Sequence, residues 1–321
     1  MEKQIQQQRK FSSKAMQTIL AFSSLILLFI IFTIASPNFF TQSNLVTILL
    51  MTAVNGILAI GITFIIISGG IDLSVGTVMT FGSVIAGLCL TKLGLPMPVG
   101  IILAILAGML CGFVNGVCIA YLKIPPFIAT MGMMNITRGL NLVVTDARPI
   151  YFTETPAFTN IATMPFIGIP LGAIIFFCCA GIAAFILSKM VIGRYCYSIG
   201  SNEEATRLSG INTAMWKISI YTMSGAFFGI AGIVMASRVA SAQPSLGAGY
   251  EMNAIAAAVI GGASLSGGEG SMLGTIIGAF IITVLTNGLR IMSVPQEWQM
   301  VVTGIIIIGA VYLDIMRRKV K

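Results

Sequence analysis

The sequence of 321 residues contains no histidine and few charged residues. Histidine is the commonest general base and a frequent transition-metal ligand, so its absence argues against a histidine-based catalytic centre. Only 9% of the residues are charged, whereas an ordinary soluble domain has roughly 25%. Because 57% of the residues are hydrophobic, most of the chain cannot face water, and we predict a membrane protein.

Other patterns typical of enzymes are also missing. The six cysteines have no zinc-like spacing, so we expect neither a metal site nor a disulfide framework. No G-x-x-x-x-G-K-[ST] phosphate loop occurs, which excludes ATP hydrolysis by that route. The apolar stretches contain no set of acidic residues, although ion-coupled carriers usually need one. We therefore expect no cofactor and no catalytic residue.

Apolar residues form ten stretches near the length of about 20 residues with which a helix crosses a membrane. We predict an all-α, polytopic membrane protein in a single domain over residues 1–321, with about ten transmembrane helices, broken helices and an internal repeat. The eighth stretch is too short for a straight span, which indicates a broken or re-entrant segment. The stretches are 18–35, 45–67, 75–90, 98–121, 127–145, 167–188, 218–238, 252–262, 272–292 and 298–313.

Basic residues gather at the two ends of the chain and in short loops. Because such loops tend to stay in the cytoplasm, we predict a cytoplasmic arm at 1–17, a cytoplasmic loop at 189–217 and a cytoplasmic tail at 314–321. Ten spans place both termini inside and the lysine-free stretch 146–166 outside, and only Lys92 falls on the wrong side. Membrane orientation therefore explains the net charge of +8 better than a nucleic-acid partner does.

Two glycine-rich breaks of similar pattern interrupt the apolar stretches. SGGIDLSVG, residues 68–76, and IGGASLSGGEG, residues 260–270, superimpose when the chain is shifted by 192 positions. Transporters commonly contain related halves with discontinuous helices at corresponding positions along the solute path, because freed backbone groups need protein or water beside them. We therefore predict an internal duplication with broken helices, and the candidate residues are Gly69, Gly70, Asp72, Ser74, Gly261, Gly262 and Ser266.

Several of these polar and small residues also have a structural explanation. Glycines at four-residue spacing, such as Gly108 and Gly112, are better explained by close helix packing than by a break. Asp72 precedes a predicted helix, so we favour an N-cap over a proton-carrying role. Asparagines in or near the spans bond well to hydroxyl-rich solutes, but they also link helices in lipid. These further path candidates are Asn55, Asn135, Asn253 and Asn287.

The long basic loop contains the sequence EATRLSG, residues 204–210. It is similar to the E-A-A-x-x-x-G loop by which ABC importer permeases engage their ATPase subunits. Such a loop needs a short helix, turned by Gly210, that fits a cleft on a soluble partner and transmits its motion. A solvated amphipathic loop has much the same sequence, and the position of the motif in the one long basic loop favours coupling. The predicted coupling residues are Glu203, Glu204, Ala205, Arg207 and Gly210.

The chain as a whole resembles the permease subunit of ribose-type ABC sugar importers. The resemblance runs through SPNFFTQSNLVTIL, SGGIDLSVG, PPFIATMGMMNITRGL, GRYCYSIGSNEEATRLSGI, SAQPSLGAGYEMNAIAAAVIGGASLSGGEG and TNGL. It implies a permease homodimer in the bacterial cytoplasmic (inner) membrane that translocates ribose or a related monosaccharide by alternating access. It also implies a tandem-domain ABC ATPase subunit inside and a periplasmic or lipid-tethered sugar-binding protein outside.

Other functions remain open at this point. An ABC permease for another small solute, such as a branched-chain amino acid, a nucleoside or a signalling furanose, would have much the same sequence pattern. An ion-coupled secondary carrier is less favoured because acidic residues are scarce in the spans. A membrane enzyme is less favoured for the same reason and because histidine is missing.

Overall fold

The computed structural model describes residues 2–319, and side chains for residues 18–309, 311, 312 and 316. The first helices are α1 (Glu2–Ala35), α2 (Gln42–Ile67), α3 (Val75–Gly87), α4 (Met97–Ala120), α5 (Pro126–Thr145) and α6 (Pro156–Thr163). They are followed by α7 (Leu171–Lys189), α8 (Val191–Ser201), α9 (Glu203–Leu208), α10 (Thr213–Val239), α11 (Tyr250–Ile260), α12 (Met272–Ile291) and α13 (Gln296–Lys319). A π-helical turn, η1 (Leu88–Lys92), continues α3.

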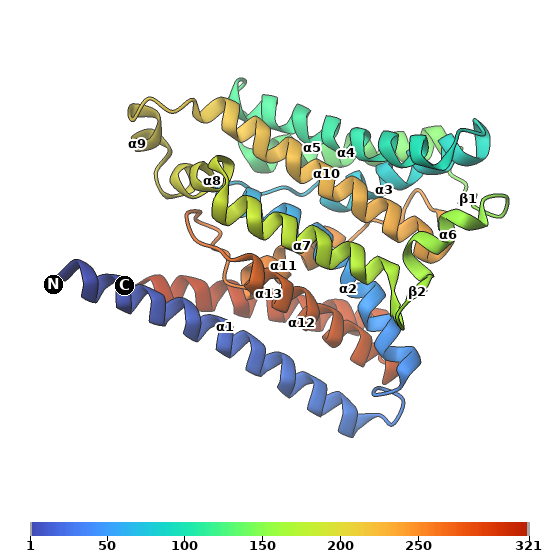
Figure 1. Cartoon of the computed structure of the whole chain (residues 1–321), viewed down its shortest axis with the longest axis horizontal. Coiled ribbons are helices and arrows are strands. Elements are labelled where there is room, and N and C mark those ends of the chain that lie inside the picture. The colour runs from blue at the N-terminus through green and yellow to red at the C-terminus, as the bar shows by residue number, and fades with distance from the viewer. Residues whose placement is uncertain (1, 320–321) are drawn as a thin grey trace.

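Two pairs of very short strands complete the described secondary structure. Strand β1 (Ile150–Tyr151) pairs with β4 (Ser241–Ala242), and β2 (Pro165–Phe166) pairs with β3 (Ile169–Pro170); both pairs are antiparallel. The long helices lie side by side, so that their connections gather at two ends (Figure 1).

The structure confirms an all-α, polytopic membrane protein. Within the described residues, eight helices are long and apolar enough to cross a membrane, judged by length and composition. The eighth predicted stretch is α11, which has only 11 residues. The tenth lies within α13, which also includes the start of the predicted tail; residues 320 and 321 lie outside the described residues.

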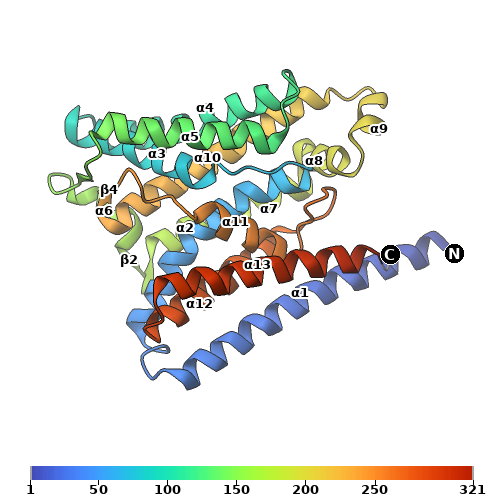
Figure 2. The same cartoon turned by 180° about the vertical axis from the view of Figure 1, so that it is seen from behind.

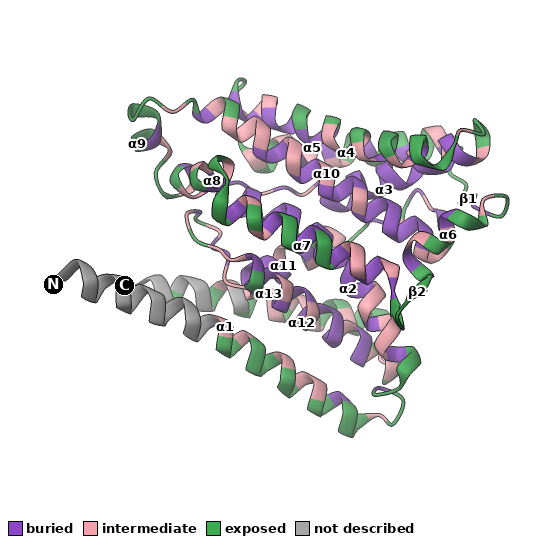
Figure 3. Ribbon diagram, in the orientation of Figure 1, coloured by how far each residue is buried: buried purple, intermediate pink, exposed green. Residues whose placement is uncertain are grey.

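Helix α2 forms the centre of the molecule because it is apolar on every side. Every residue from Met51 to Ile67 is buried, as expected for a helix that is hydrophobic all round. Helices α7, α10, α11 and α12 pack against it, and Figure 3 shows the buried residues concentrated in these inner helices. The outer helix α1 instead exposes apolar side chains such as Leu27 and Ile34, which face lipid at little cost.

Glycines bring α4 and α10 into backbone contact. A Cβ atom added at Gly108 would overlap the carbonyl oxygen of Gly225, and one added at Gly112 would overlap the carbonyl oxygen of Tyr221. A Cβ atom at Gly116 would lie 2.7 Å from Cα of Ile218. The packing interpretation of these four-residue spacings is therefore confirmed.

The two ends of the helix array carry different segments. Helices α8 and α9 lie at one end, together with the N-terminal end of α1 and the C-terminal end of α13 (Figure 1). Helix α6 and the strand pairs lie at the opposite end (Figure 2). The segments predicted to be cytoplasmic therefore gather at one end.

The predicted start of the sixth apolar stretch is wrong. Residues 167–170 were predicted to begin a helix, but they belong to the β2–β3 hairpin, whose turn has positive φ at Ile167 (52°) and Gly168 (80°). Helix α7 starts only after Pro170, which lacks the N–H needed inside a helix. The predicted cytoplasmic loop 189–217 contains α8, α9 and the start of α10.

Candidate coupling site and broken helices

The first glycine break caps the end of α2. Gly69 has φ 81°, and its N–H donates to the carbonyl oxygen of Ile66 (2.9 Å). The N–H of Gly70 donates to the carbonyl oxygen of Ile65 (2.9 Å). This pair of bonds is a Schellman cap, which needs a residue in the left-handed region and so favours glycine.

The second break caps α11 in the same way. Gly262 has φ 93° and donates to the carbonyl oxygen of Val259 (2.9 Å). The N–H of Ala263 donates to the carbonyl oxygen of Ala258 (2.9 Å). Gly69 thus corresponds to Gly262, a shift of 193 positions (262 − 69). The predicted shift of 192 positions aligns identical residues of the two breaks, whereas the two caps align at a shift that is one residue longer.

The two breaks meet each other at the end of α8. The N–H of Gly268 donates to the carbonyl oxygen of Ile67, the last residue of α2 (2.8 Å). Gly200, near the end of α8, lies against this bond, because a Cβ atom added there would be 2.6 Å from the Gly268 nitrogen. The hydroxyl of Tyr197 in α8 donates to the carbonyl oxygen of Gly270 (2.9 Å). Segments almost 200 residues apart therefore share one junction with α8.

Asp72 organises the chain between α2 and α3. Its Oδ1 accepts hydrogen bonds from the backbone N–H of Ser74 (2.7 Å) and from the hydroxyl of Ser74 (2.6 Å). Asn115 of α4 donates from Nδ2 to Oγ of Ser74 (3.2 Å). Burial raises the pKa of Asp72 from 3.8 to about 6, although the bonds from Ser74 oppose the shift. Asp72 thus holds the turn that leads into α3, but the prediction that it caps this helix is wrong, because the N-cap residue is Ser74 and its side chain makes no capping bond there.

Helix α9 is the short helix that the motif predicted. Oδ1 of Asn202 accepts a hydrogen bond from the N–H of Ala205 (2.9 Å), which caps the N-terminus of α9. At the other end Gly210 has φ 82° and turns the chain toward α10. Glu204 and Arg207 form an exposed ion pair (2.6 Å), which lowers the pKa of the Glu204 carboxyl.

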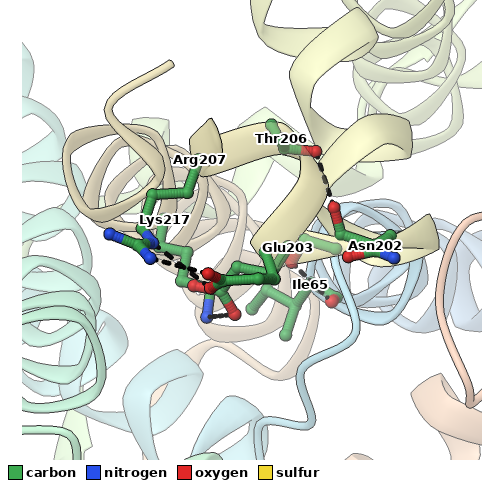
Figure 4. A network of polar contacts seen from close by, with 8 residues as sticks. Ile65, Asn202, Glu203, Thr206, Arg207 and Lys217 are labelled. Atoms are coloured by element: carbon green, nitrogen blue, oxygen red, sulfur yellow. Dashed lines mark hydrogen bonds and ion pairs between the residues drawn. The ribbon is translucent and has the colours of Figure 1, made fainter. Parts of the chain in front are cut away.

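A second ion pair ties α9 to α10. Nζ of Lys217 lies 2.6 Å from Oε2 of Glu203, and the side chains of Arg207 and Lys217 point toward the acidic start of α9 (Figure 4). A pocket of about 390 Å³ opens beside these charges, and its lining includes Lys123, Pro125, Glu203 and Arg207. The charged side chains of α9 therefore border a hollow between α9, the loop after α4 and the start of α10.

The predicted path asparagines do not form one group. Asn55 donates from Nδ2 to Oγ1 of Thr283 (3.4 Å) and Asn287 donates from Nδ2 to Oδ1 of Asn44 (3.0 Å), so both link α2 to α12. Asn253 is half-buried in α11, and Asn135 is exposed on α5. Ser266 is also exposed.

Sequence reasoning missed the residues that join these parts. Thr63 and Thr275 share a hydrogen bond between α2 and α12 (2.8 Å), and Asn115 reaches the first break from α4. Gly200 and Tyr197 lie in the predicted loop 189–217 and in a block that carries the family resemblance, but neither was a candidate residue. The one signal in the sequence is the glycine directly before Ser201 and the capping Asn202, a position where α8 could approach other backbone closely.

Comparison with known proteins agrees with this architecture. Residues 44–311 match the family described as "Branched-chain amino acid transport system / permease component". No solved structure matches the chain.

Several curated proteins are similar along nearly the whole chain. The ribose import permease protein RbsC of Bacillus subtilis is 42% identical over 313 residues, 97% of each chain. The protein of the same name from Haemophilus influenzae is 41% identical over 297 residues, 92% of each chain. The fructose import permease protein FrcC of Rhizobium meliloti is 35% identical over 296 residues, 89% of this chain and 82% of the relative. The chain therefore belongs to the family of ribose-type import permeases, the membrane subunits of ABC importers.

Proposed function

We propose that this chain is the membrane-spanning subunit of a bacterial importer for ribose or a related monosaccharide. It moves the sugar by alternating access of its broken helices and performs no covalent chemistry. A separate tandem-domain ATPase supplies the energy, and a periplasmic or lipid-tethered binding protein delivers the sugar. The choice of sugar is supported by the ribose and fructose import permeases to which the chain is similar.

The observation that carries this proposal is the junction of α8 with both breaks. Helix α9 follows α8 directly, its exposed surface includes Glu204, Arg207 and the apolar Leu208 (74% exposed), and it is held by its own cap and ion pairs. A soluble partner that binds α9 would thus be separated by only a few residues of this chain from the hydrogen bond between Gly268 and Ile67. We assign the contact with the ATPase to α9 and the adjacent pocket.

The proposed orientation puts the α9 end of the molecule in the cytoplasm of an inner-membrane protein. Lys123, Arg207 and Lys217 lie at this end around the pocket, and basic residues tend to remain on the cytoplasmic side. Both termini are then cytoplasmic, since α1 begins and α13 ends at this end of the molecule (Figure 1).

One face of α5 supports a homodimer with the sugar path beside it. Asn135 and Arg138 lie near the midpoint of this span and are exposed, yet an arginine at the centre of a bilayer costs about 3 kcal/mol or more when it faces lipid. Apart from the backbone of α5 itself, no atom of the described residues lies within 4 Å of a Cβ position at Gly132 or Gly139, so a second copy can approach this face closely. Helix α5 lies at the edge of the array, where such an approach is open (Figure 2).

Substrate choice is tested with the binding protein encoded beside this chain. Calorimetry should detect binding of ribose or another monosaccharide, and liposomes with the full complex should take up the same sugar when ATP is supplied. Binding of branched-chain amino acids alone would refute the sugar assignment and favour the alternative solute. An unrelated polar solute, such as glycerol, serves as the control.

A further inference from the structure

The end of α8 carries a glycine at the place where it touches both broken helices. Gly200 is the residue before the last of α8, and only Ser201 and Asn202 separate it from α9. It lies in the last turn of α8, and glycine has a lower helix propensity than alanine. The position therefore needs a reason other than helix formation.

That reason is a backbone contact without room for a side chain. A Cβ atom at Gly200 would overlap the carbonyl oxygen of Ile67 and would lie 2.6 Å from the nitrogen of Gly268. These two atoms are the acceptor and the donor of the hydrogen bond that joins the two breaks. In the opposite direction, a Cβ atom at Gly267 would lie 2.6 Å from the carbonyl oxygen of Gly200. The contact is thus backbone against backbone on both sides.

Two side-chain bonds hold α8 in this position. The hydroxyl of Tyr197 donates to the carbonyl oxygen of Gly270, which lies just before α12. Sγ of Cys196 donates to the carbonyl oxygen of Phe64, in the last turn of α2. Helix α8 is therefore fastened to the end of α2 and to the segment before α12, about one helical turn before Gly200.

We propose that Gly200 is the positioning residue through which movement of α9 reaches both broken helices at once. Close-packed backbone has no rotatable side chain to absorb a displacement, and packed interfaces switch between discrete arrangements rather than deform. A shift of α9 that carries α8 along must then move the ends of α2 and α11–α12 together. The inference rests on the proposed function, because it takes α9 as the segment that the ATPase moves.

The test compares transport with ATP consumption in one preparation. The full complex of permease, ATPase and binding protein is placed in liposomes, and ribose uptake and ATP hydrolysis are measured in the same vesicles. Gly200→Ala should lower the number of ribose molecules moved per ATP by about tenfold, within the range typical of coupling between sites, while the complex still assembles and hydrolyses ATP. Gly181→Ala is the matched control, because a Cβ atom at this glycine of α7 meets no described atom outside the backbone of α7 within 4 Å.

Several results would overturn the inference. A wild-type ratio of ribose to ATP in Gly200→Ala would mean that the contact does not transmit motion. Parallel loss of assembly, hydrolysis and uptake would mean that Gly200 is only a packing residue. If Gly200→Ala yields no protein, the same assay is carried out with Tyr197→Phe. This variant removes the bond to Gly270 without adding volume, and an unchanged ratio of ribose to ATP would refute the proposal. Failure of the proposed function is distinguishable from failure of this inference, because the wild-type complex itself would then show no ATP-dependent ribose uptake.

Discussion

Replacement of Asp72 by asparagine should remove a pH dependence from the stability of the protein. Asp72 is 1% exposed, and its Oδ1 accepts both bonds from Ser74. Asparagine keeps an oxygen at this position, so the turn before α3 retains its acceptor. Asp72→Asn therefore changes the charge and leaves the geometry of the turn in place.

The sign of the effect follows from the direction of the pKa shift. Burial raises the pKa of Asp72 from 3.8 to about 6 in the folded protein, so the folded state binds the proton more tightly than the unfolded state does. At pH values below 3.8, the pKa of the carboxyl group in the unfolded state, the group does not destabilise the fold. As the pH rises from there to about 6, the free energy of unfolding falls. At about 1.4 kcal/mol per pKa unit, the full loss above this window is roughly 3 kcal/mol.

Thermal unfolding of the detergent-solubilised protein measures this loss. The melting temperature of the wild type should fall between about pH 4 and pH 6, whereas that of Asp72→Asn should change much less. Asp146→Asn is the matched control, because Asp146 is exposed at the end of α5 and this variant should keep the wild-type pH dependence. If the melting temperature of Asp72→Asn falls with pH as steeply as that of the wild type, Asp72 is not the group responsible for the pH dependence.

Three further substitutions test the contacts that hold the helices. Gly225→Val drives a side chain into the carbonyl group of Gly108 and should lower stability by about 3 kcal/mol; an unchanged melting temperature would contradict the backbone contact. Asn287→Leu removes the donor to Asn44 and should cost about 1 kcal/mol by the same assay, so a more stable variant would argue against the link. Asn202→Ala removes the cap of α9, which is worth about 1 kcal/mol, and should weaken co-purification of the ATPase, whereas Asn202→Asp should restore it.

Hydropathy alone was enough to predict most of the fold. A membrane forces backbone groups to bond within helices, so each apolar stretch of the right length is a helix. The polar and glycine-rich residues on either side of α11 indicated that this helix is short. The hairpin at residues 165–170 was missed because Phe166 and Ile167 are as apolar as the span that follows. Their exposure and the positive φ of Ile167 depend on a turn that hydropathy does not encode.

The candidate site was predicted in pieces but not as a whole. Local signals predicted the helix breaks at Gly69, Gly70, Gly261 and Gly262 and the short helix before Gly210, because each depends on neighbours in sequence. The junction at Gly200 depends on three segments that are distant in sequence, so this glycine, one among 35, does not indicate which segments it contacts. Asn55 and Asn287 likewise could not be told from path residues until their partners across α2 and α12 were known.

The claim that α9 must be driven by an ATPase is tested most directly by uptake into liposomes that contain this chain with and without its partners. Ribose should accumulate only when the ATPase, the binding protein and ATP are all present, and should not accumulate when a proton or sodium gradient is applied to the chain alone. Accumulation driven by such a gradient without the ATPase would show that α9 does not need an ATPase.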